Sequence, residues 1–395
     1  MSLLARRGDS PQDRFATELL ELFRADGRTD DAWYDREQFA ISVRPNGGPP
    51  VWAGLTDLYQ EWGLGDAANR GKALQSFVDA AVEPTALPDT WEEAKSLVRP
   101  ALRGITAALP PNREPESGAL WRHAYPYLAE IVVLDDSSTQ VSIEQLSQWD
   151  VSAETVLDAA RRHLASQATR PQFSALNSPR VLRLVDDGRT HFVAQLMLDS
   201  WLAGFGQHLG ARPVAFVPDG STLLIAPDEP SVLASLFEMA EEEYGQASRP
   251  VSPMAYTVTD AGRVLPYTAP AGHPLHVPVG RAERVLAAAE YGRQKRWLEE
   301  AGSPHRTGSV MLSGRADASI FSVGTLAFGK PTLLPRTDYV AVTDDDAQLV
   351  FLTWESAEQI FGLVPEPNLE PSRFLADPAE VSQDALRAAS VNPSA

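Results

Sequence analysis

The feature that most constrains the fold is a hairpin signal inside residues 181–244. Two apolar runs, 214–217 and 222–226, flank the turn Pro218-Asp219-Gly220-Ser221. Proline fixes φ at the start of such a turn, and glycine adopts a positive φ without steric cost. The pattern therefore predicts two antiparallel strands, and the helical spacing of residues 230–244 predicts a helix behind them, capped by Ser231.

The same periodicities run along the rest of the chain. Apolar residues at helical spacing predict helices over residues 12–24, 51–62, 71–81, 91–108, 153–165, 192–209, 281–301 and 355–362. Short apolar or alternating runs predict strands over 39–43, 127–134, 139–142, 181–185, 254–258, 309–312, 319–323, 339–342 and 348–352. This mixture predicts an α+β fold, with helices and short antiparallel sheets in two or three lobes.

Breaker-rich segments suggest where the lobes meet. The run Pro110-Pro111-Asn112-Arg113-Glu114-Pro115 predicts an exposed loop, and a proline-rich stretch follows Tyr244. We therefore expect an N-terminal α+β lobe (1–112), a central α+β lobe (113–270), a C-terminal α+β extension (271–375) and a flexible tail (376–395).

Composition narrows the classes of partner. The chain has 34 Lys and Arg against 53 Asp and Glu, a formal net charge of −19 over 395 residues. Such a charge repels polyphosphates, so we expect neither nucleic acid nor a membrane as partner. The absence of cysteine excludes disulfides, thiolate metal sites and a cysteine nucleophile. The first residues lack the apolar core of a secretory leader, and no apolar run approaches the roughly 20 residues that span a bilayer, so we expect a cytoplasmic protein.

The order of several short patterns resembles a known family. The patterns are Ile131-Val132-Val133-Leu134-Asp135, residues 141–152, Ala211-Arg212-Pro213-Val214-Ala215-Phe216-Val217-Pro218, and Leu223-Leu224-Ile225. In this order they resemble the DUF1444 family, also called YtpQ-like or UPF0354, over roughly residues 15–267. The resemblance implies an α+β cytosolic protein and carries over no catalytic residue. The segment 281–374 extends beyond it, and Leu333-Leu334-Pro335-Arg336-Thr337-Asp338-Tyr339 is its most distinctive run.

Motifs for metal or nucleotide chemistry are weak. Of the seven histidines, His273 and His276 are near neighbours, in a proline-rich loop without a carboxylate beside them. We predict no metal site and no cofactor. In Gly204-Phe205-Gly206-Gln207-His208-Leu209-Gly210 the last glycine comes one residue late for a dinucleotide fingerprint, so we interpret Gly210 as a helix C-cap.

Candidate catalytic groups also have plainer explanations. The aspartates at 135–136, 186–187 and 344–346 lie between predicted strands, where aspartate is a good turn former. Ser200 lies eight or more residues from His191 and His208 on one predicted helix, too far for the hydrogen bond of about 3 Å that a serine nucleophile needs. Catalytic residues therefore stay unassigned.

The remaining functional signal is aromatic. Contiguous aromatic area is typical of protein interfaces, and it predicts a partner surface at Trp33, Tyr34, Trp121, Tyr125 and Tyr127. We expect a non-enzymatic binding or accessory protein that acts through contacts with another protein. One alternative is a hydrolase or other enzyme whose site assembles from dispersed acidic residues. The other is an acidic inhibitor or immunity-type protein steered to a basic partner.

Overall fold

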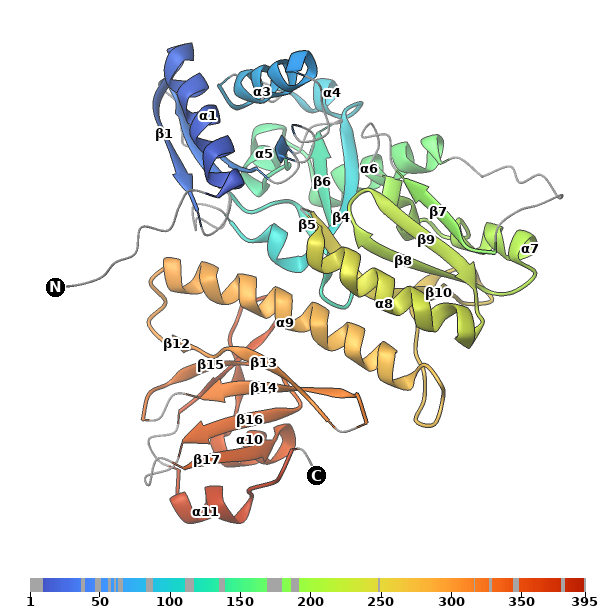
Figure 1. Cartoon of the computed structure of the whole chain (residues 1–395), viewed down its shortest axis with the longest axis vertical. Coiled ribbons are helices and arrows are strands. Elements are labelled where there is room, and N and C mark those ends of the chain that lie inside the picture. The colour runs from blue at the N-terminus through green and yellow to red at the C-terminus, as the bar shows by residue number, and fades with distance from the viewer. Residues whose placement is uncertain are drawn as a thin grey trace. The chain divides into compact units, whose positions relative to one another are not determined.

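The chain divides into two compact units, each with its own buried hydrophobic residues. The computed structural model describes residues 10–36, 40–46, 51–55, 58–59, 62, 67–82, 88–110, 117–134, 139–168, 180–185, 192–247, 249–315, 317–326, 329–343, 348–377 and 381–393. They belong to two compact units, Met1–Pro88 and Asp89–Ala395, shown in Figure 1. Helices and five small, mostly antiparallel sheets confirm the predicted α+β class. The acidic turns predicted at 135–136, 186–187 and 344–346, and His191, lie outside the described residues.

The first unit packs two helices on a three-stranded antiparallel sheet. Its elements are α1 (Pro11–Asp26), β1 (Thr29–Asp35), β2 (Ala40–Pro45), β3 (Val51–Gly54) and α3 (Ala67–Val82). Helix α1 begins at a capping box, in which the Ser10 hydroxyl accepts from the Asp13 backbone N–H and the Asp13 carboxylate accepts from the Ser10 N–H. Its buried residues Phe15, Leu19 and Phe23 recur on one face, as predicted for a helix over 12–24.

The helix predicted over 51–62 is wrong at its start. Residues 51–54 form β3, which pairs antiparallel with β2, Ile41 opposite Ala53 and Ser42 opposite Trp52. The bias of valine and tryptophan toward strands, together with a partner strand close in sequence, outweighs the helical spacing of the apolar residues.

The second unit opens with a three-stranded sheet in the order β4-β6-β5. Its elements are α4 (Trp91–Ala94), β4 (Val98–Gly104), the 3-10 turn η1 (Ile105–Ala108), β5 (Trp121–Tyr125), β6 (Leu128–Leu134), α5 (Ile143–Gln148) and α6 (Ala153–Gln167). The helix predicted over 91–108 is therefore wrong beyond residue 94. Pro100 cannot donate within a helix, but at an edge strand it is tolerated. The strand at 127–134 and the helix at 153–165 are confirmed, the latter with Ser152 as its cap.

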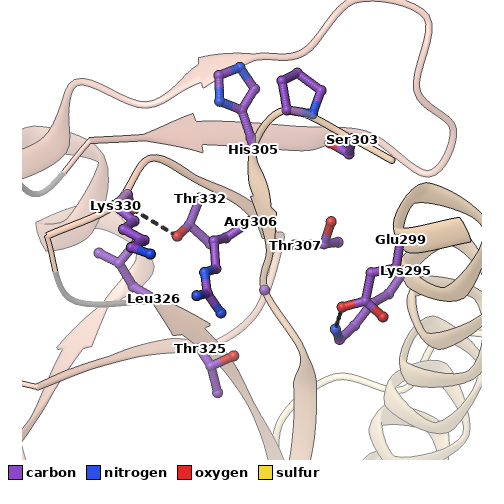
Figure 2. A pocket seen from close by; sticks show the side chains of 12 residues that line it. Lys295, Glu299, Ser303, His305, Arg306, Thr307, Thr325, Leu326, Lys330 and Thr332 are labelled. Atoms are coloured by element: carbon purple, nitrogen blue, oxygen red, sulfur yellow. Dashed lines mark hydrogen bonds and ion pairs between the residues drawn. The ribbon is translucent and has the colours of Figure 1, made fainter. Parts of the chain in front are cut away.

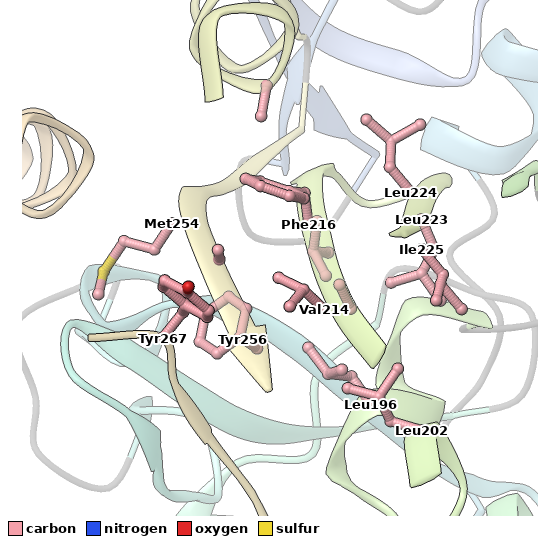
Figure 3. Packing of buried hydrophobic residues seen from close by; sticks show 14 of the residues in the cluster. Leu196, Leu202, Val214, Phe216, Leu223, Leu224, Ile225, Met254, Tyr256 and Tyr267 are labelled. Atoms are coloured by element: carbon pink, nitrogen blue, oxygen red, sulfur yellow. The ribbon is translucent and has the colours of Figure 1, made fainter. Parts of the chain in front are cut away.

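A five-stranded sheet carries the largest core. The strand order is β11-β10-β8-β9-β7, from β7 (Leu182–Val185), β8 (Pro213–Asp219), β9 (Thr222–Pro227), β10 (Pro250–Val258) and β11 (Val264–Pro266). The helix α8 (Pro230–Gln246) packs against β8, β9 and β10, with the rings of Phe216 and Phe237 4.9 Å apart. Figure 3 shows the labelled side chains of this core gathered around β8, β9 and β10. The predicted hairpin is confirmed, because β8 and β9 pair antiparallel. The predicted Ser231 cap is wrong, since the N-cap is Glu229 and no side chain caps the helix.

The helix predicted over 192–209 is broken into three pieces. They are the 3-10 turns η3 (Phe192–Met197) and η4 (Leu202–Phe205) and the short α7 (Gly206–Leu209). Ser200 has a φ of 63°, which ends a right-handed helix, and its N–H donates to the carbonyl of Gly262 at 2.9 Å. Gly210, with a φ of 67°, is the C-cap that the sequence predicts.

The last part of the second unit contains two four-stranded sheets, ordered β12-β15-β19-β18 and β13-β14-β16-β17, and α9 packs against β12, β13 and β14 (Figure 1). The elements are α9 (His276–Glu300), β12 (Arg306–Thr307), β13 (Val310–Gly314), β14 (Ile320–Leu326), β15 (Thr332–Pro335), β16 (Tyr339–Thr343), β17 (Leu349–Thr353), α10 (Trp354–Phe361), β18 (Val364–Pro365), β19 (Arg373–Ala376) and α11 (Gln383–Ala388). Pairs β12–β15 and β14–β16 are parallel. The four strands predicted in this region are confirmed, and four short ones were not predicted.

Candidate functional site

The five aromatic residues predicted as a partner surface fall in both units. In the first unit, Trp33 and Tyr34 are neighbours on β1; Trp33 is 45% exposed, whereas the hydroxyl of Tyr34 donates to Asp13 at 3.3 Å. Burial and the nearby Asp13 carboxylate raise the pKa of Tyr34. Within this pair, Trp33 is the side chain that is open to a partner.

In the second unit, Trp121, Tyr125 and Tyr127 lie on β5 and on the turn that follows it. All three are half-buried. The Tyr125 hydroxyl donates to the carbonyl of Leu196 at 3.0 Å, and its ring packs against Tyr256. Tyr125 and Tyr127 thus contribute to the packing of the large core as well as to the surface.

The neighbouring histidines His273 and His276 make local contacts. Nδ1 of His273 accepts from the Leu275 N–H at 3.1 Å, just before the start of α9, and Nδ1 of His276 lies 2.9 Å from the carbonyl of Ala269. Among the described residues, no group of three or more His, Asp or Glu side chains is placed to hold a metal ion.

A basic pocket is the most distinctive cavity of the second unit. It has a volume of about 600 Å³ and lies where the C-terminal end of α9 meets β12 and the turn between β14 and β15. Figure 2 shows Lys295 and Glu299 on α9, with Arg306 on β12 and Lys330 on the turn before β15. Its hydroxyl-bearing walls are Ser303, Thr307, Thr325 and Thr332.

The position of β12 sets the shape of this pocket. The Arg306 N–H donates to the carbonyl of Pro331 at 3.2 Å, and the Gly308 N–H donates to that of Leu333 at 3.0 Å. A Cβ at Gly308 would lie 2.6 Å from the carbonyl oxygen of Thr325 on β14, so only glycine lets the segment after β12 approach β14 this closely. Beneath them, Nη1 of the buried Arg373 donates to the carbonyls of Gly308 and Leu333 at 2.8 and 3.1 Å.

The charge of the pocket is opposite in sign to the net charge of the chain. The pocket has three positive charges, from Lys295, Arg306 and Lys330, and one negative charge, from Glu299. With His305 neutral its net charge is +2, whereas that of the whole chain is −19. Lys295 pairs with Glu299. Arg306 and Lys330 are exposed, and neither forms an ion pair within the described part of the chain.

This arrangement suits anion binding. Unpaired cations at a concave surface concentrate a positive potential, and hydroxyl groups add hydrogen bonds to oxyanions. Fold and pocket together define an α+β protein with a basic cavity at a sheet edge. Compared with known proteins, the chain matches no protein-family model, no curated sequence and no solved structure. The DUF1444 resemblance thus stays a prediction. None of the helices in the described ranges combines the length and apolar character that crossing a bilayer requires.

Proposed function

We propose that the chain is a non-enzymatic, cytoplasmic binding or accessory protein whose basic pocket receives an acidic group of another protein. One observation carries the proposal: Arg306 and Lys330 are exposed beside a cavity in a strongly acidic chain, and neither forms an ion pair with another described residue. Such a cluster does not increase the solubility of an acidic protein. An acidic side chain or a terminal carboxylate of a partner protein, however, would find two ion-pair partners there.

The side chains favour a segment of a protein over a tightly enclosed metabolite. Lysine is a hydrated point charge on a flexible stem, which adapts to a range of carboxylate positions. The cations also come from three separate places, the end of α9, β12 and the turn before β15, so they bracket an extended ligand.

The direct test is a fluorescence-anisotropy titration with a fluorescein-labelled polyglutamate peptide. The wild-type chain is expected to bind it at low salt and to release it as salt rises, because exposed ion pairs are screened over about 10 Å at 0.1 M. The double variant Arg306→Gln/Lys330→Gln should bind at least about tenfold more weakly.

A matched control distinguishes the effect of the pocket's charges from that of the overall charge of the chain. Arg263→Gln/Arg296→Gln also removes two positive charges, from exposed positions outside the pocket, and should bind the peptide like the wild type. Equal weakening by both double variants would reject the pocket as the site. The same titration with labelled polylysine tests the alternative of an acidic inhibitor, which requires binding of the basic peptide instead. A search for hydrolysis products of the bound peptide tests the enzyme alternative.

A further inference from the structure

A second cavity of the same unit is built around arginines that the basic pocket does not use. It has a volume of about 490 Å³ and is lined by α9, β14, β16 and the start of α10. Its ionisable side chains, apart from the tyrosines, are Glu283, Arg284, Arg315, Arg336, Asp338 and Glu355. The distinctive run 333–339 supplies Arg336, Thr337, Asp338 and Tyr339.

One ion pair of this cavity is internal. The guanidinium of Arg284 donates from Nε and Nη2 to the two carboxylate oxygens of Asp338, each at 2.8 Å, and Ser322 donates to Asp338 from its N–H and its hydroxyl, each at 2.7 Å. Burial opposes ionisation of Asp338, but these hydrogen bonds outweigh it and lower its pKa. Arg284 and Asp338 therefore satisfy each other and form a rigid wall.

Two other guanidinium groups are held in place by aromatic rings. Arg315 lies over the rings of Phe321 and Tyr339, at 4.7 and 5.9 Å, and its Nη2 donates to the Tyr339 hydroxyl at 3.0 Å. Arg336 lies over the ring of Trp354 at 5.2 Å. Stacking of this kind orients the planar fork of arginine, which matches the two oxygens of a carboxylate. Neither Arg315 nor Arg336 forms an ion pair in the described ranges.

Two carboxylates of the cavity are equally available. Glu283 is exposed within α9 and Glu355 is exposed in the first turn of α10, and neither forms an ion pair with a described residue. With the Arg284–Asp338 pair set aside, the cavity thus presents two guanidinium groups and two carboxylates that do not neutralise each other. A simple anion would be repelled by the glutamates, and a simple cation by the arginines.

We propose that this cavity binds a small zwitterion, a molecule that carries both a carboxylate and an ammonium group as an amino acid does. Arg315 and Arg336 bind the carboxylate, Glu283 and Glu355 bind the ammonium group, and the rings of Tyr127 and Tyr339 border the remaining space. The inference concerns a cavity separate from the basic pocket and does not depend on the function proposed for that pocket.

The test is a calorimetric titration of the full chain with each of the twenty standard L-amino acids, tested alone. At least one is expected to bind at a single site. Its N-acetyl derivative lacks the ammonium charge and its carboxamide lacks the carboxylate, so each should bind at least about tenfold more weakly. If none of the amino acids binds, or if the N-acetyl derivative binds as tightly as its parent, the proposal is overturned.

Variants place the binding in this cavity. Arg336→Gln is the cleaner substitution, because Arg336 is exposed and its backbone N–H still donates to the Tyr291 hydroxyl. It should weaken the amino acid at least about tenfold, whereas Arg306→Gln in the basic pocket should leave the affinity unchanged. Glu283→Gln/Glu355→Gln should weaken the amino acid but not its N-acetyl derivative. Unchanged affinity in both Arg336→Gln and Glu283→Gln/Glu355→Gln would overturn the proposal.

Discussion

Nε of Arg373 donates to Oε1 of Gln294 at 2.6 Å, and both side chains are completely buried. The same guanidinium donates to the carbonyls of Gly308, Leu333 and Tyr291. Burial lowers the pKa of Arg373 to about 10, which leaves it charged at neutral pH. One side chain on β19 therefore ties α9, β12 and β15 together beneath the basic pocket.

Replacing Arg373 should destabilise this region strongly. Arg373→Met keeps much of the apolar stem but leaves the buried Gln294 oxygen without this donor and removes a hydrogen bond to each of three carbonyls. We expect the free energy of unfolding to fall by about 3–5 kcal/mol, measured by urea unfolding of the full chain. Arg296→Gln, on the exposed side of α9, is the control and should change it by less than about 0.5 kcal/mol. A loss below about 1 kcal/mol in Arg373→Met would contradict the assigned role.

Alanine substitutions at Gly104 and Gly292 should change the stability of the chain in opposite directions. A Cβ at Gly104 would overlap the carboxylate of Glu290, with 2.7 Å to its Cδ. That carboxylate is completely buried and accepts from the N–H and hydroxyl of Thr106 at 2.9 and 2.6 Å. Gly104→Ala must displace this carboxylate and should lower the free energy of unfolding by about 1–3 kcal/mol. Gly292 is exposed in α9 with open space around its Cα, so Gly292→Ala should raise the free energy of unfolding by about 0.5–1 kcal/mol. Thermal unfolding of the two variants under one condition compares them directly, and equal signs would refute the argument.

Local signals were sufficient where the stabilising contacts are local. In the hairpin of β8 and β9, the Asp219 carboxylate accepts from the N–H groups of Ser221 and Thr222 at 2.6 and 2.8 Å. All of these contacts lie within four residues, so the turn can be read from the sequence. The break at Ser200 cannot, because it depends on a hydrogen bond to Gly262, which is far away in sequence.

The basic pocket was missed for a related reason. Its cations come from α9, from a strand of two residues and from the turn before β15, and none of these carries a motif. The strongly negative net charge pointed away from any basic site, since a sum over the chain says nothing about local balance. The second cavity left one signal, the distinctive run 333–339, although its chemistry depends on Arg284 and Arg315 from other elements.

The ion pairs of Glu130 predict the order of stability of three variants. This carboxylate is completely buried on β6, whereas its partners Arg122 on β5 and Arg161 on α6 are partly exposed. Arg161→Gln leaves Glu130 with Arg122 and should cost least. Glu130→Gln costs more, about 1.5–3 kcal/mol, because both guanidinium groups lose a charged acceptor but still reach water. Arg122→Gln/Arg161→Gln should cost most, about 3–5 kcal/mol, because it leaves a buried charge alone. Chemical unfolding of the three variants at neutral pH tests the order, and the reverse order would show that the arginines act by packing alone.

Tyr267 predicts how stability changes at alkaline pH. Its hydroxyl donates to Oδ1 of Asp228 at 2.8 Å. Burial, followed by this hydrogen bond to a carboxylate, raises the pKa of Tyr267 from 10.0 to about 12. The folded chain therefore holds this proton more tightly than the unfolded chain. The resulting stabilisation is complete below pH 10 and is lost as the pH rises from about 10 to about 12.

The variant Tyr267→Phe isolates this contribution from those of the other tyrosines. At pH 8 it should unfold more easily than the wild type by about 1 kcal/mol, because the hydrogen bond is gone. The difference between the two proteins should then shrink between pH 10 and pH 12, since only the wild type can lose a proton at this position. Unfolding in urea at a series of pH values gives this difference directly, and titrations common to both chains cancel in it. A difference that stays constant over this range would mean that Tyr267 contributes by packing and not through its proton.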